Sequence, residues 1–413
     1  MKTKIQLFSV AVAMLSFVAC SKDDIADEQD PVNQNPATGA PVETGQANTN
    51  YAPAFVGQTR VNSVQTTTPY QSTILNSSLS APWGIVALPD GRFLVTEKVG
   101  NMRILTSTGT ASAPITGFPT VNNSGQGGLL DVCVDPNFST NRMVYWTYVR
   151  NVTGGTAIAV GKGRLSNNET VIENPVVIYA STTPASPTSN YGSRLMFDST
   201  GNLLVTFGDR FSDNVRIEAQ FASSSIGKVI RIDTNGNAAA GNPVISQPGA
   251  RPEVFTMGHR NSQGLAIHPV TGDIWECEHG PRGGDELNRL QPGANYGWPV
   301  ISYGIEYSGQ PVGGGIQQQN GMQQPVYYWD PVVSPSGMTF YAGNKVPEWQ
   351  NNLFLCSLTQ THIIRLVIQN NQVTGEERLL VGEGQRFRDI IQGADNALYA
   401  ITDAGRFYRI DRQ

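Results

Sequence analysis

The sequence is poor in charged residues, which make up only 15% of its 413 positions, and basic residues are not in excess. The 28 lysines and arginines stand against 33 aspartates and glutamates, for a net charge of −5. Because nucleic-acid binding requires a clustered basic face, this mild acidity argues against a nucleic-acid partner. The chain also lacks a convincing long amphipathic helical pattern, although its 39% of hydrophobic residues can bury a large core.

No apolar run near the N-terminus is long enough to span a membrane. Residues 7–19 are apolar, follow two lysines and end at Cys20, whereas a spanning helix needs about 20 apolar residues. The run is typical of an export signal. Its ending, FVAC, resembles a bacterial lipoprotein cleavage box, so we expect an exported protein held at the membrane only through a lipid on Cys20. Cleavage without lipidation is the alternative.

Cysteine is scarce and lacks close spacing. Apart from Cys20, the chain has Cys133, Cys277 and Cys356, each inside an apolar run. Buried free thiols are therefore expected. One disulfide between two of the three cysteines is the alternative in an exported protein.

The residues after the signal, 21–60, are rich in Asp, Asn, Pro, Gly and Thr, with few apolar side chains. Such a segment cannot bury enough surface to offset its ordering entropy. We expect a disordered polar linker there and one folded domain over residues 61–413.

The folded part repeats one pattern: a short apolar-alternating run, a turn rich in Pro, Asp, Gly or Asn, and a second apolar run. Short strands with turn punctuation indicate an all-β protein, and six such units predict a six-bladed β-propeller. The units are residues 83–97, 129–149, 194–209, 264–278, 337–357 and 388–403.

The fourth unit carries the densest polar motif. Arg260 and Asn261 stand directly before its first run, and Glu278 and His279 come at the end of its second. In a propeller such positions from all blades gather at one mouth of the channel, where basic groups beside carboxylates suit an anionic small ligand plus a cation. A polar, water-lined channel without a ligand is the alternative.

Several motifs now carry a family resemblance. In order from about Ala81 to the C-terminus, the chain resembles the soluble pyrroloquinoline quinone (PQQ)-dependent aldose and glucose dehydrogenases, which include glucose/sorbosone dehydrogenases. The resemblance implies a six-bladed propeller that binds PQQ and Ca²⁺ in its funnel and oxidises the anomeric carbon of an aldose to a lactone. The motifs are GQGGLLDV, GSRLMFD with TFGDR, GHRNSQGLAIHP, EHGPRGGDELN with NYGWP, SPSGMTFY and RFRDI.

The resemblance implies roles for residues of the funnel. PQQ is a tricarboxylate, so Arg386 and Arg388 would bind its carboxylates through charge-assisted hydrogen bonds. Arg260 would stabilise negative charge on the quinone carbonyl that accepts hydride, with Asn261 as a neighbouring donor. Gln126 would face the sugar or the edge of the quinone.

The resemblance also implies two calcium sites. Gly280 and Pro281 would offer main-chain carbonyls to Ca²⁺, a hard ion that takes oxygen ligands. Glu286 and the region of Tyr296 correspond to a second, structural Ca²⁺ site of the family. Trp329 is expected near the cofactor, where it would form an apolar wall over the sugar, with core packing as the alternative.

Two positions depart from the family pattern. The general-base histidine of the family is replaced by Asn190, and an amide cannot accept the proton of a sugar hydroxyl; losing a positioned base lowers the rate about 10²- to 10⁴-fold. Thr359 stands where the family usually has a lysine that reaches the cofactor. None of the four histidines is an evident replacement base, and Asp209 is expected in a surface loop.

Three functions from different classes are compatible with these residues. The first is an exported PQQ- and Ca²⁺-dependent aldose dehydrogenase that passes electrons to an unidentified acceptor. The second is a catalytically impaired propeller that binds a ligand or serves in surface interactions. The third, a Ca²⁺-dependent lactonase-like hydrolase, requires carboxylates and amides ringing the channel, whereas this sequence gathers arginines there.

Overall fold

The structure is a computed structural model, and it describes residues 38–413. The predicted export signal, Cys20 and the first part of the polar linker lie outside the described residues. Within residues 38–413, no helix has the length and apolar character needed to cross a membrane.

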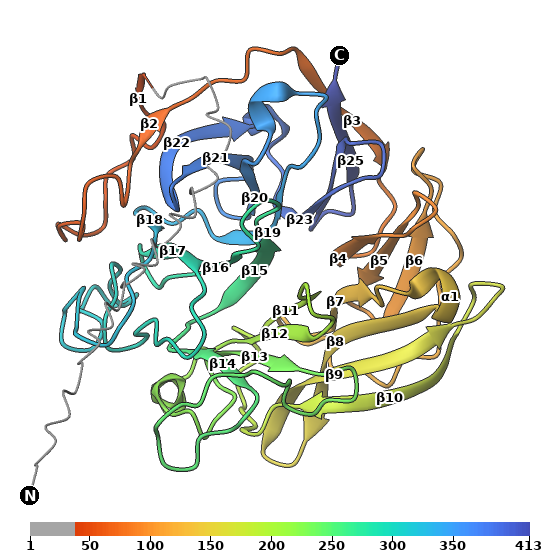
Figure 1. Ribbon diagram of the computed structural model, residues 1–413, viewed down its shortest axis with the longest axis horizontal. Coiled ribbons are helices and arrows are strands. Elements are labelled where there is room, and N and C mark those ends of the chain that lie inside the picture. The colour runs from red at the N-terminus through yellow and green to blue at the C-terminus, as the bar shows by residue number, and fades with distance from the viewer. Residues whose placement is uncertain (1–37) are drawn as a thin grey trace, which may run out of the picture.

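Six β-sheets are arranged around one axis as the blades of a propeller (Figure 1). Each sheet is antiparallel from its innermost to its outermost blade strand, as follows. Blade 1 is β4 (Pro82–Ala87), β5 (Phe93–Glu97) and β6 (Asn101–Leu105); blade 2 is β7 (Leu129–Val134), β8 (Met143–Val152), β9 (Gly155–Leu165) and β10 (Ile172–Ala180); blade 3 is β11 (Gly192–Phe197), β12 (Leu203–Phe207), β13 (Lys228–Ile232) and β14 (Val254–Met257). Blade 4 is β15 (Ser262–Ile267), β16 (Ile274–Glu278), β17 (Asp285–Arg289) and β18 (Tyr327–Trp329); blade 5 is β19 (Pro335–Phe340), β20 (Leu353–Ser357), β21 (Ile363–Gln369) and β22 (Gln372–Leu379); blade 6 is β23 (Phe387–Gln392), β24 (Leu398–Thr402), β25 (Phe407–Arg412) and β3 (Tyr70–Asn76).

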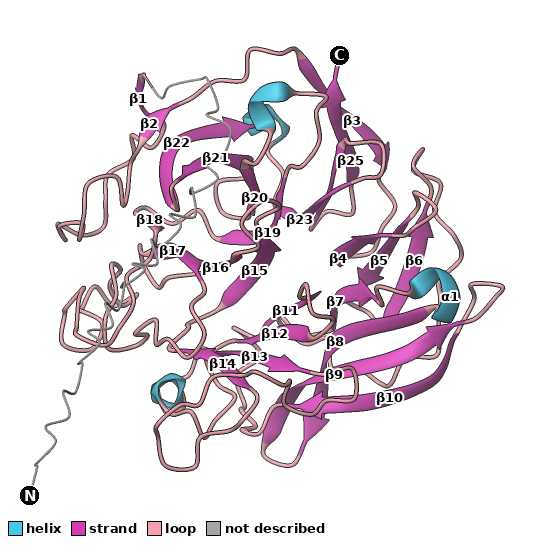
Figure 2. Ribbon diagram, viewed as in Figure 1, coloured by secondary structure: helices cyan, strands magenta, loops and turns pink. Residues whose placement is uncertain are grey.

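Two short strands, β1 (Gly39–Pro41) and β2 (Asn62–Ser63), extend the sheet of blade 5. Helical segments are short throughout the described chain, as Figure 2 shows. They are α1 (Phe138–Asn141) and the 3₁₀ turns η1 (Arg216–Gln220), η2 (Pro347–Trp349) and η3 (Val381–Glu383). The predicted all-β class and six-bladed propeller are confirmed, and the six sequence repeats are the inner strand pairs of the six blades.

The ring of blades closes through the two ends of the domain. Strand β3, from the N-terminal side, pairs with the C-terminal strand β25 to complete blade 6, with Tyr70 opposite Arg412. The innermost strands contact one another in a closed cycle, from β4 through β7, β11, β15, β19 and β23 back to β4. The last blade therefore depends on strand pairing between residues far apart in the sequence.

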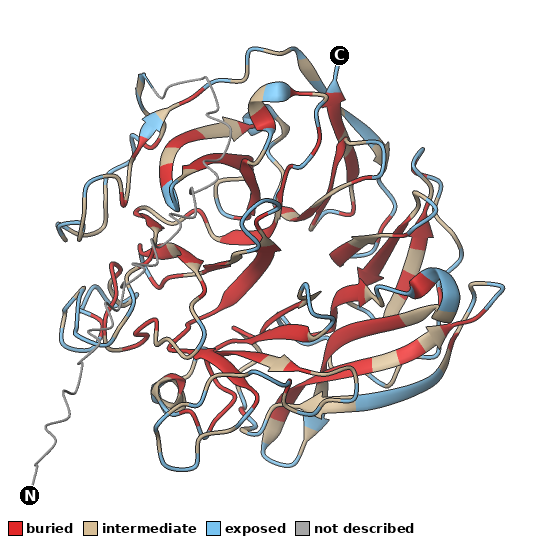
Figure 3. Cartoon of the chain, in the orientation of Figure 1, coloured by how far each residue is buried: buried red, intermediate tan, exposed pale blue. Residues whose placement is uncertain are grey.

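The strands are apolar on both faces because each blade packs between two others. In β12, Leu203 and Val205 pack into a cluster shared with blade 2, whereas Leu204 between them packs toward blade 4. Alternate side chains of a strand point to opposite faces of the sheet, so a continuous apolar run fills both interfaces. Figure 3 shows the inner strands as the most buried part of each blade.

Threonines on the second strands tie neighbouring blades together. The hydroxyl of Thr147 accepts a hydrogen bond from the N–H of Asp131 in its own blade, at 3.0 Å, and donates to the carbonyl of Ser193 in the next, at 2.7 Å. Thr206 repeats this arrangement one blade further, and Thr96 one blade earlier. In blades 1, 2 and 3, a main-chain N–H at the irregular start of the inner strand is thereby hydrogen-bonded by a threonine of the second strand.

A buried arginine joins five blades near the axis. The Arg194 guanidinium donates to Asp131 at 3.0 Å, to Asp389 at 2.7 Å and to the carbonyl of Gln263 at 2.8 Å. Asp389 in turn accepts the N–H of Ile85 at 3.1 Å. This ion cluster lies across the channel and connects blades 1, 2, 3, 4 and 6.

Replacing Arg194 by Met should lower the free energy of unfolding by about 3–5 kcal/mol, because two buried carboxylates lose their counter-ion. Arg164→Met is the matched control: Arg164 pairs with Glu173 at 2.8 Å in a half-exposed ion pair, and such a pair contributes about 0–1 kcal/mol. Urea unfolding at neutral pH measures both variants. An equal decrease in the free energy of unfolding in both variants would show that the buried ion cluster around Arg194 stabilises the protein no more than an exposed ion pair does.

The polar segment before the propeller corrects one prediction. The flexible linker was expected to reach residue 60, but the described residues from 38 onward pack on the domain. The carboxylate of Asp330 accepts hydrogen bonds from the main-chain N–H groups of Asn48 and Thr49, at 2.9 and 3.0 Å, and Gln58 is fully buried. These residues are held by specific hydrogen bonds to blade 4 rather than by apolar burial, so composition alone does not reveal their order.

The three cysteines of the described chain are buried and free, as the apolar runs around them predict, and none forms the disulfide that was left open.

Candidate active site

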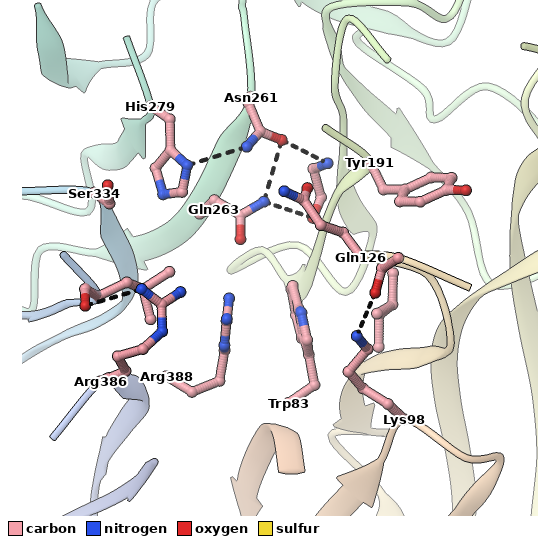
Figure 4. Close-up of a pocket in the computed structure, with 14 residues that line it drawn as sticks. Trp83, Lys98, Gln126, Tyr191, Asn261, Gln263, His279, Ser334, Arg386 and Arg388 are labelled. Atoms are coloured by element: carbon pink, nitrogen blue, oxygen red, sulfur yellow. Dashed lines mark hydrogen bonds between the residues drawn. The ribbon is translucent and has the colours of Figure 1, made fainter. Parts of the chain in front are cut away.

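A cavity of about 250 Å³ opens at one mouth of the channel. Figure 4 shows side chains converging on it from blades 1 to 6. Four residues predicted for the site, Gln126, Asn261, Arg386 and Arg388, line this cavity. They are joined by Trp83, Lys98, Tyr191, Gln263, His279 and Ser334.

One wall of the cavity is cationic. Arg386 and Arg388 share the carboxylate of Asp403, at 2.9 and 2.7 Å, and Lys98 donates to the carbonyl of Gly125 at 3.0 Å. Burial and the charge of Arg388 lower the pKa of Lys98. Burial acts to raise the pKa of Asp403, but the two arginines hold it below its usual value. With three cations and one carboxylate, the wall attracts an anionic ligand.

The opposite wall consists of amides and one imidazole. Asn261 accepts hydrogen bonds from the N–H of Gly192 at 3.0 Å and from Gln263 at 3.2 Å, and its amide N–H₂ contacts Nδ1 of His279 at 3.3 Å. Nε2 of His279 lies 2.9 Å from the carbonyl of Pro335. Burial, together with Arg260 and Arg388, lowers the pKa of His279 to about 3. His279 is therefore neutral and occupied at both nitrogens, which leaves it unsuited to accept a proton.

Asn190 lies beside a buried carboxylate. Its amide N–H₂ donates to Asp209 Oδ1 at 2.9 Å, and its main-chain N–H donates to the side-chain oxygen of Gln126 at 2.8 Å. Asp209 also accepts from the indole of Trp298 at 3.0 Å and from the N–H of Phe211 at 2.8 Å. The expectation of a surface-loop Asp209 is wrong: the residue is 2% exposed, and burial raises its pKa.

Arg260 lies between the central cavity and two adjoining hollows that it lines. Its guanidinium donates to the carbonyls of His279 and Gly280, at 2.9 and 2.6 Å, and lies 5.3 Å over the ring of Trp298. Its main-chain N–H donates to Glu278. The buried Nε of Arg260 has no hydrogen-bond partner within the described residues. A buried donor left unsatisfied is costly, so this nitrogen is available to a ligand.

An acidic cluster lies behind Arg260 in blade 4. Glu276 and Glu278 are buried, and the amide of Asn288 donates to both and to Glu286, at 3.1 to 3.3 Å. Nδ1 of His259 lies 3.2 Å from Glu278. Burial and the neighbouring Glu278 raise the pKa of Glu276 well above its usual value. Ligand atoms of His259, Glu276 and Glu278 lie within 4.8 Å of one another, close enough to hold one metal ion.

The residues proposed as calcium ligands are distributed between these features. Pro281 lines both hollows beside Arg260, and Gly280 and Glu286 line the smaller one. Tyr296 lines that hollow too and stacks on His259, with ring centres 4.8 Å apart. The four residues thus converge on one side of Arg260.

Arg260 and Asn190 do not line the cavity of about 250 Å³, and two further predicted residues, Trp329 and Thr359, are not brought to it either. Trp329 is on β18, the outermost strand of blade 4, where it is 2% exposed and packs against Tyr327 at 5.0 Å in the core between blades. Its predicted place over the sugar is corrected to core packing, because an outer strand cannot reach the axis. Thr359 is an exposed residue near the rim, and its hydroxyl bonds that of Ser334.

The sequence placed Lys98 at the mouth without giving it a role, and it did not point to Gln263 or Trp298. Lys98 follows the second strand of its repeat, a position that the propeller places at the mouth, so its location was predictable. Gln263 is two residues beyond Asn261, and the alternation of a strand brings both side chains to the same face. No pattern in the sequence indicated that Trp298 would hold Asp209.

Fold and site together define the class of the protein: a six-bladed β-propeller with a cationic ligand cavity at one mouth of its channel. A family model described as glucose/sorbosone dehydrogenase matches residues 79–409. The chain belongs to the glucose/sorbosone dehydrogenase family, as its motifs predicted.

Known relatives agree with this assignment. The chain is 38% identical over 333 residues to an aldose sugar dehydrogenase of Escherichia coli strain K12, covering 80% of this chain and 89% of the relative. The apo-form crystal structure of the soluble aldose sugar dehydrogenase from Escherichia coli is 35% identical, with a TM-score of 0.79, and the match covers 83% of this chain and all (100%) of that one. The PQQ-bound aldose sugar dehydrogenase from Streptomyces coelicolor, 24% identical over 84% of this chain and 99% of its own, shares the fold with a TM-score of 0.68.

Proposed function

We propose that the protein is a PQQ- and Ca²⁺-dependent aldose sugar dehydrogenase that oxidises the anomeric carbon of a sugar to a lactone. The observation that carries this proposal is the convergence of Lys98, Arg386 and Arg388 on one wall of the cavity. A tricarboxylate matches a wall with three cations. The family membership and the names of the relatives support the choice of an aldose substrate.

The residues present fit PQQ. Arg386 and Arg388 would hold its carboxylates, and Lys98, from blade 1, supplies a cation in a chain that has Thr359 instead of the usual lysine. The unpartnered Nε of Arg260 provides a donor for a quinone oxygen. When bound, PQQ supplies the two-electron acceptor that takes the hydride from the anomeric carbon.

The fit to calcium differs between the two proposed sites. At the first, Arg260 donates to the carbonyl of Gly280 at 2.6 Å, so a cation on Gly280 and Pro281 requires this guanidinium to turn away. At the second site, near Glu286 and Tyr296, the buried acceptor oxygens outnumber the hydrogen-bond donors around them. Buried oxygens of Glu276 and Asn288 have no hydrogen-bond partner within the described residues. Hard oxygen ligands of this kind suit Ca²⁺.

Proton transfer falls to Asp209 in this proposal. The carboxamide of Asn190 orients the sugar hydroxyl but cannot accept its proton. Asp209 is the ionisable group bonded to Asn190, and the raised pKa that burial gives it makes it a stronger base than an exposed aspartate. Because three donors already bind this carboxylate, we expect slow turnover.

Reconstitution tests the proposal. The full-length chain in detergent should bind PQQ in the presence of Ca²⁺, followed by absorbance, and should then reduce a dye when an aldose is added. Arg388→Met should weaken PQQ binding about 10- to 100-fold, the scale of one charged hydrogen bond. Arg406→Met is the control, since Arg406 lies outside the cavity on the turn into β25 and contacts Tyr408. Failure of the unchanged chain to bind PQQ would refute the cofactor assignment.

A second candidate function is favoured by Asn190 alone: a propeller that binds its ligand without turnover and acts in ligand binding or surface interactions. Tight PQQ binding with no dye reduction for any aldose, restored by Asn190→His, would identify this case.

We also propose that the protein is exported and anchored by a lipid on Cys20. The support is the sequence of its first 20 residues. Metabolic labelling with a radioactive fatty acid, abolished by Cys20→Ser, is the expected result.

A further inference from the structure

Residues 38–60 form an N-terminal strap on the outer side of blades 4 and 5. The strap lies outside residues 79–409, which the family model matches. Strand β1 within the strap and strand β2 just after it continue the sheet of blade 5 at the edge of the ring (Figure 1). The family match therefore assigns no role to this segment, and its contacts have to show one.

The strap contacts two chain connections that also line the cavity of about 250 Å³. It binds Asp330 in the connection from β18 to β19, and Ser334 of the same connection lines the cavity. It also binds Gln360 in the connection from β20 to β21, and Leu358 of that connection lines the cavity. The strap thus lies against the mouth end of both blades.

Asp330 is the main anchor of the strap, and it is only 4% exposed. Its Oδ1 accepts from the main-chain N–H and the side-chain amide of Asn48, at 2.9 and 2.7 Å. Its Oδ2 accepts from the main-chain N–H and the hydroxyl of Thr49, at 3.0 and 3.1 Å. Arg60, at the other end of the strap, donates to the main-chain carbonyl of Asp330 at 2.7 Å. Hydrogen bonds to a carboxylate are stronger than neutral ones, so these contacts fix Asp330 firmly.

Asp330 and Asn48 in turn hold the loop 280–284. Gly283 of this loop has a φ of 83°, and a Cβ atom there would lie 2.7 Å from Oδ1 of Asp330. The backbone therefore approaches the carboxylate more closely than any residue with a side chain could. The side-chain oxygen of Asn48 accepts from Nε of Arg282 at 2.9 Å. The loop that carries the carbonyls of Gly280 and Pro281 is thus packed on the strap.

A second contact braces blade 5. The carboxylate of Glu43 accepts from Arg378 at 2.8 Å and from the amide of Gln360 at 3.1 Å. Two residues before Gln360, the carbonyl of Leu358 accepts from the guanidinium of Arg386 at 3.1 Å. The strap is therefore one connection away from an arginine of the cationic wall.

We propose that the strap positions the loop 280–284 for cation binding, with Asn48 and Thr49 as its positioning residues. Neither residue lines the cavity of about 250 Å³, so both act through Asp330. Main-chain carbonyls bind a cation more tightly when the loop is already ordered, because binding then costs less conformational entropy. The inference rests on the proposed function, which takes Gly280 and Pro281 as Ca²⁺ ligands.

The first test needs neither PQQ nor Ca²⁺. The main-chain N–H groups of Gly280, Arg282 and Gly284 are all hydrogen-bonded, so their amide exchange reports opening of the loop. Asn48→Ala with Thr49→Val removes two side-chain donors from Asp330. Peptides that span residues 280–284 should then exchange about tenfold faster, as measured by mass spectrometry. Thr49→Ser retains the hydroxyl donor and should exchange like the original chain.

Thr67→Val with Thr68→Val is the matched control. These two hydroxyls also donate to one carboxylate, that of Glu348, at 2.6 and 2.7 Å. Glu348 is in η2, between β19 and β20, at the other end of blade 5 from the mouth. The control should leave exchange of residues 280–284 unchanged. Equal acceleration in both double variants would show general loss of stability and would overturn the proposal.

The second test follows PQQ binding by absorbance while Ca²⁺ is titrated into the full-length chain in detergent. The Ca²⁺ concentration for half-maximal binding should rise about tenfold in Asn48→Ala with Thr49→Val and stay constant in the control. At saturating Ca²⁺ and PQQ, kcat should match that of the original chain, since the strap touches no reacting group. Faster exchange with an unchanged Ca²⁺ requirement would overturn the positioning role. Failure of the original chain to bind PQQ would refute the proposed function, whereas the exchange experiment would still report whether the strap orders the loop.

Discussion

Asn190→His should raise kcat for aldose oxidation about 100-fold. The amide N–H₂ of Asn190 now donates to Asp209 Oδ1 at 2.9 Å. An imidazole at this position can make the same hydrogen bond through Nδ1–H, which fixes its tautomer and leaves Nε2 free to accept the sugar proton. Steady-state kinetics of dye reduction, with the protein saturated in PQQ and Ca²⁺, measures the effect.

Asn190→Gln is the control for this gain, since it retains an amide and adds no base. A rise in kcat with both variants would point to altered packing rather than to proton transfer. Unchanged turnover in Asn190→His, with PQQ binding intact, would show that proton abstraction does not limit this protein and would contradict the role given to position 190.

Asp209→Asn should lower kcat about 10²- to 10⁴-fold, because it removes the proposed proton acceptor. In the original chain, activity should also fall as the pH is lowered through the pKa of Asp209, since only the carboxylate accepts a proton. Burial raises this pKa, so the loss should begin above the value of about 4 that is usual for an exposed aspartate. The pH profile of kcat tests this expectation.

The substitution leaves the shape of residue 209 nearly unchanged. Its amide oxygen can still accept from the indole of Trp298, but its N–H₂ group then faces two donors, the amide of Asn190 and the N–H of Phe211. The thermal midpoint should therefore fall by a few degrees, whereas the Kd for PQQ should stay close to that of the original chain, because residue 209 does not line the cavity with Arg386 and Arg388. A large loss of PQQ binding in Asp209→Asn would mean that the residue organises the pocket rather than accepting a proton. In the Asn190→His background, Asp209→Asn should cancel most of the gain, because the imidazole loses its orienting partner.

The architecture could be predicted from the sequence because it follows from short-range patterns. Each inner strand pair is one apolar alternation broken by a turn, as in the unit from Arg194 to Asp209, and local patterning reports such hairpins directly. The count of six and the placement of Gln126, Asn261, Arg386 and Arg388 at one mouth followed from the repeat. A repeated unit brings equivalent positions to equivalent places.

Other features were decided only by the tertiary structure. Trp329 lies in the core because β18 is the outermost strand of its blade. The sequence pattern does not indicate the position of a strand within its blade. Asp209 is buried because Trp298, 89 positions away, donates to it. The residues from 38 to 60 are ordered because Asp330 binds Asn48 and Thr49.

The sequence by itself thus determined the strand pairs, the number of blades and the polar ring at the mouth, since these arise from the local period of apolar side chains. Only the tertiary structure decided which polar groups are hydrogen-bonded to each other, which carboxylates are buried away from water and which aromatic side chains remain exposed. Those properties depend on neighbours distant in sequence, and the burial that raises the pKa of Asp209 and Glu276 exists only once the blades have packed.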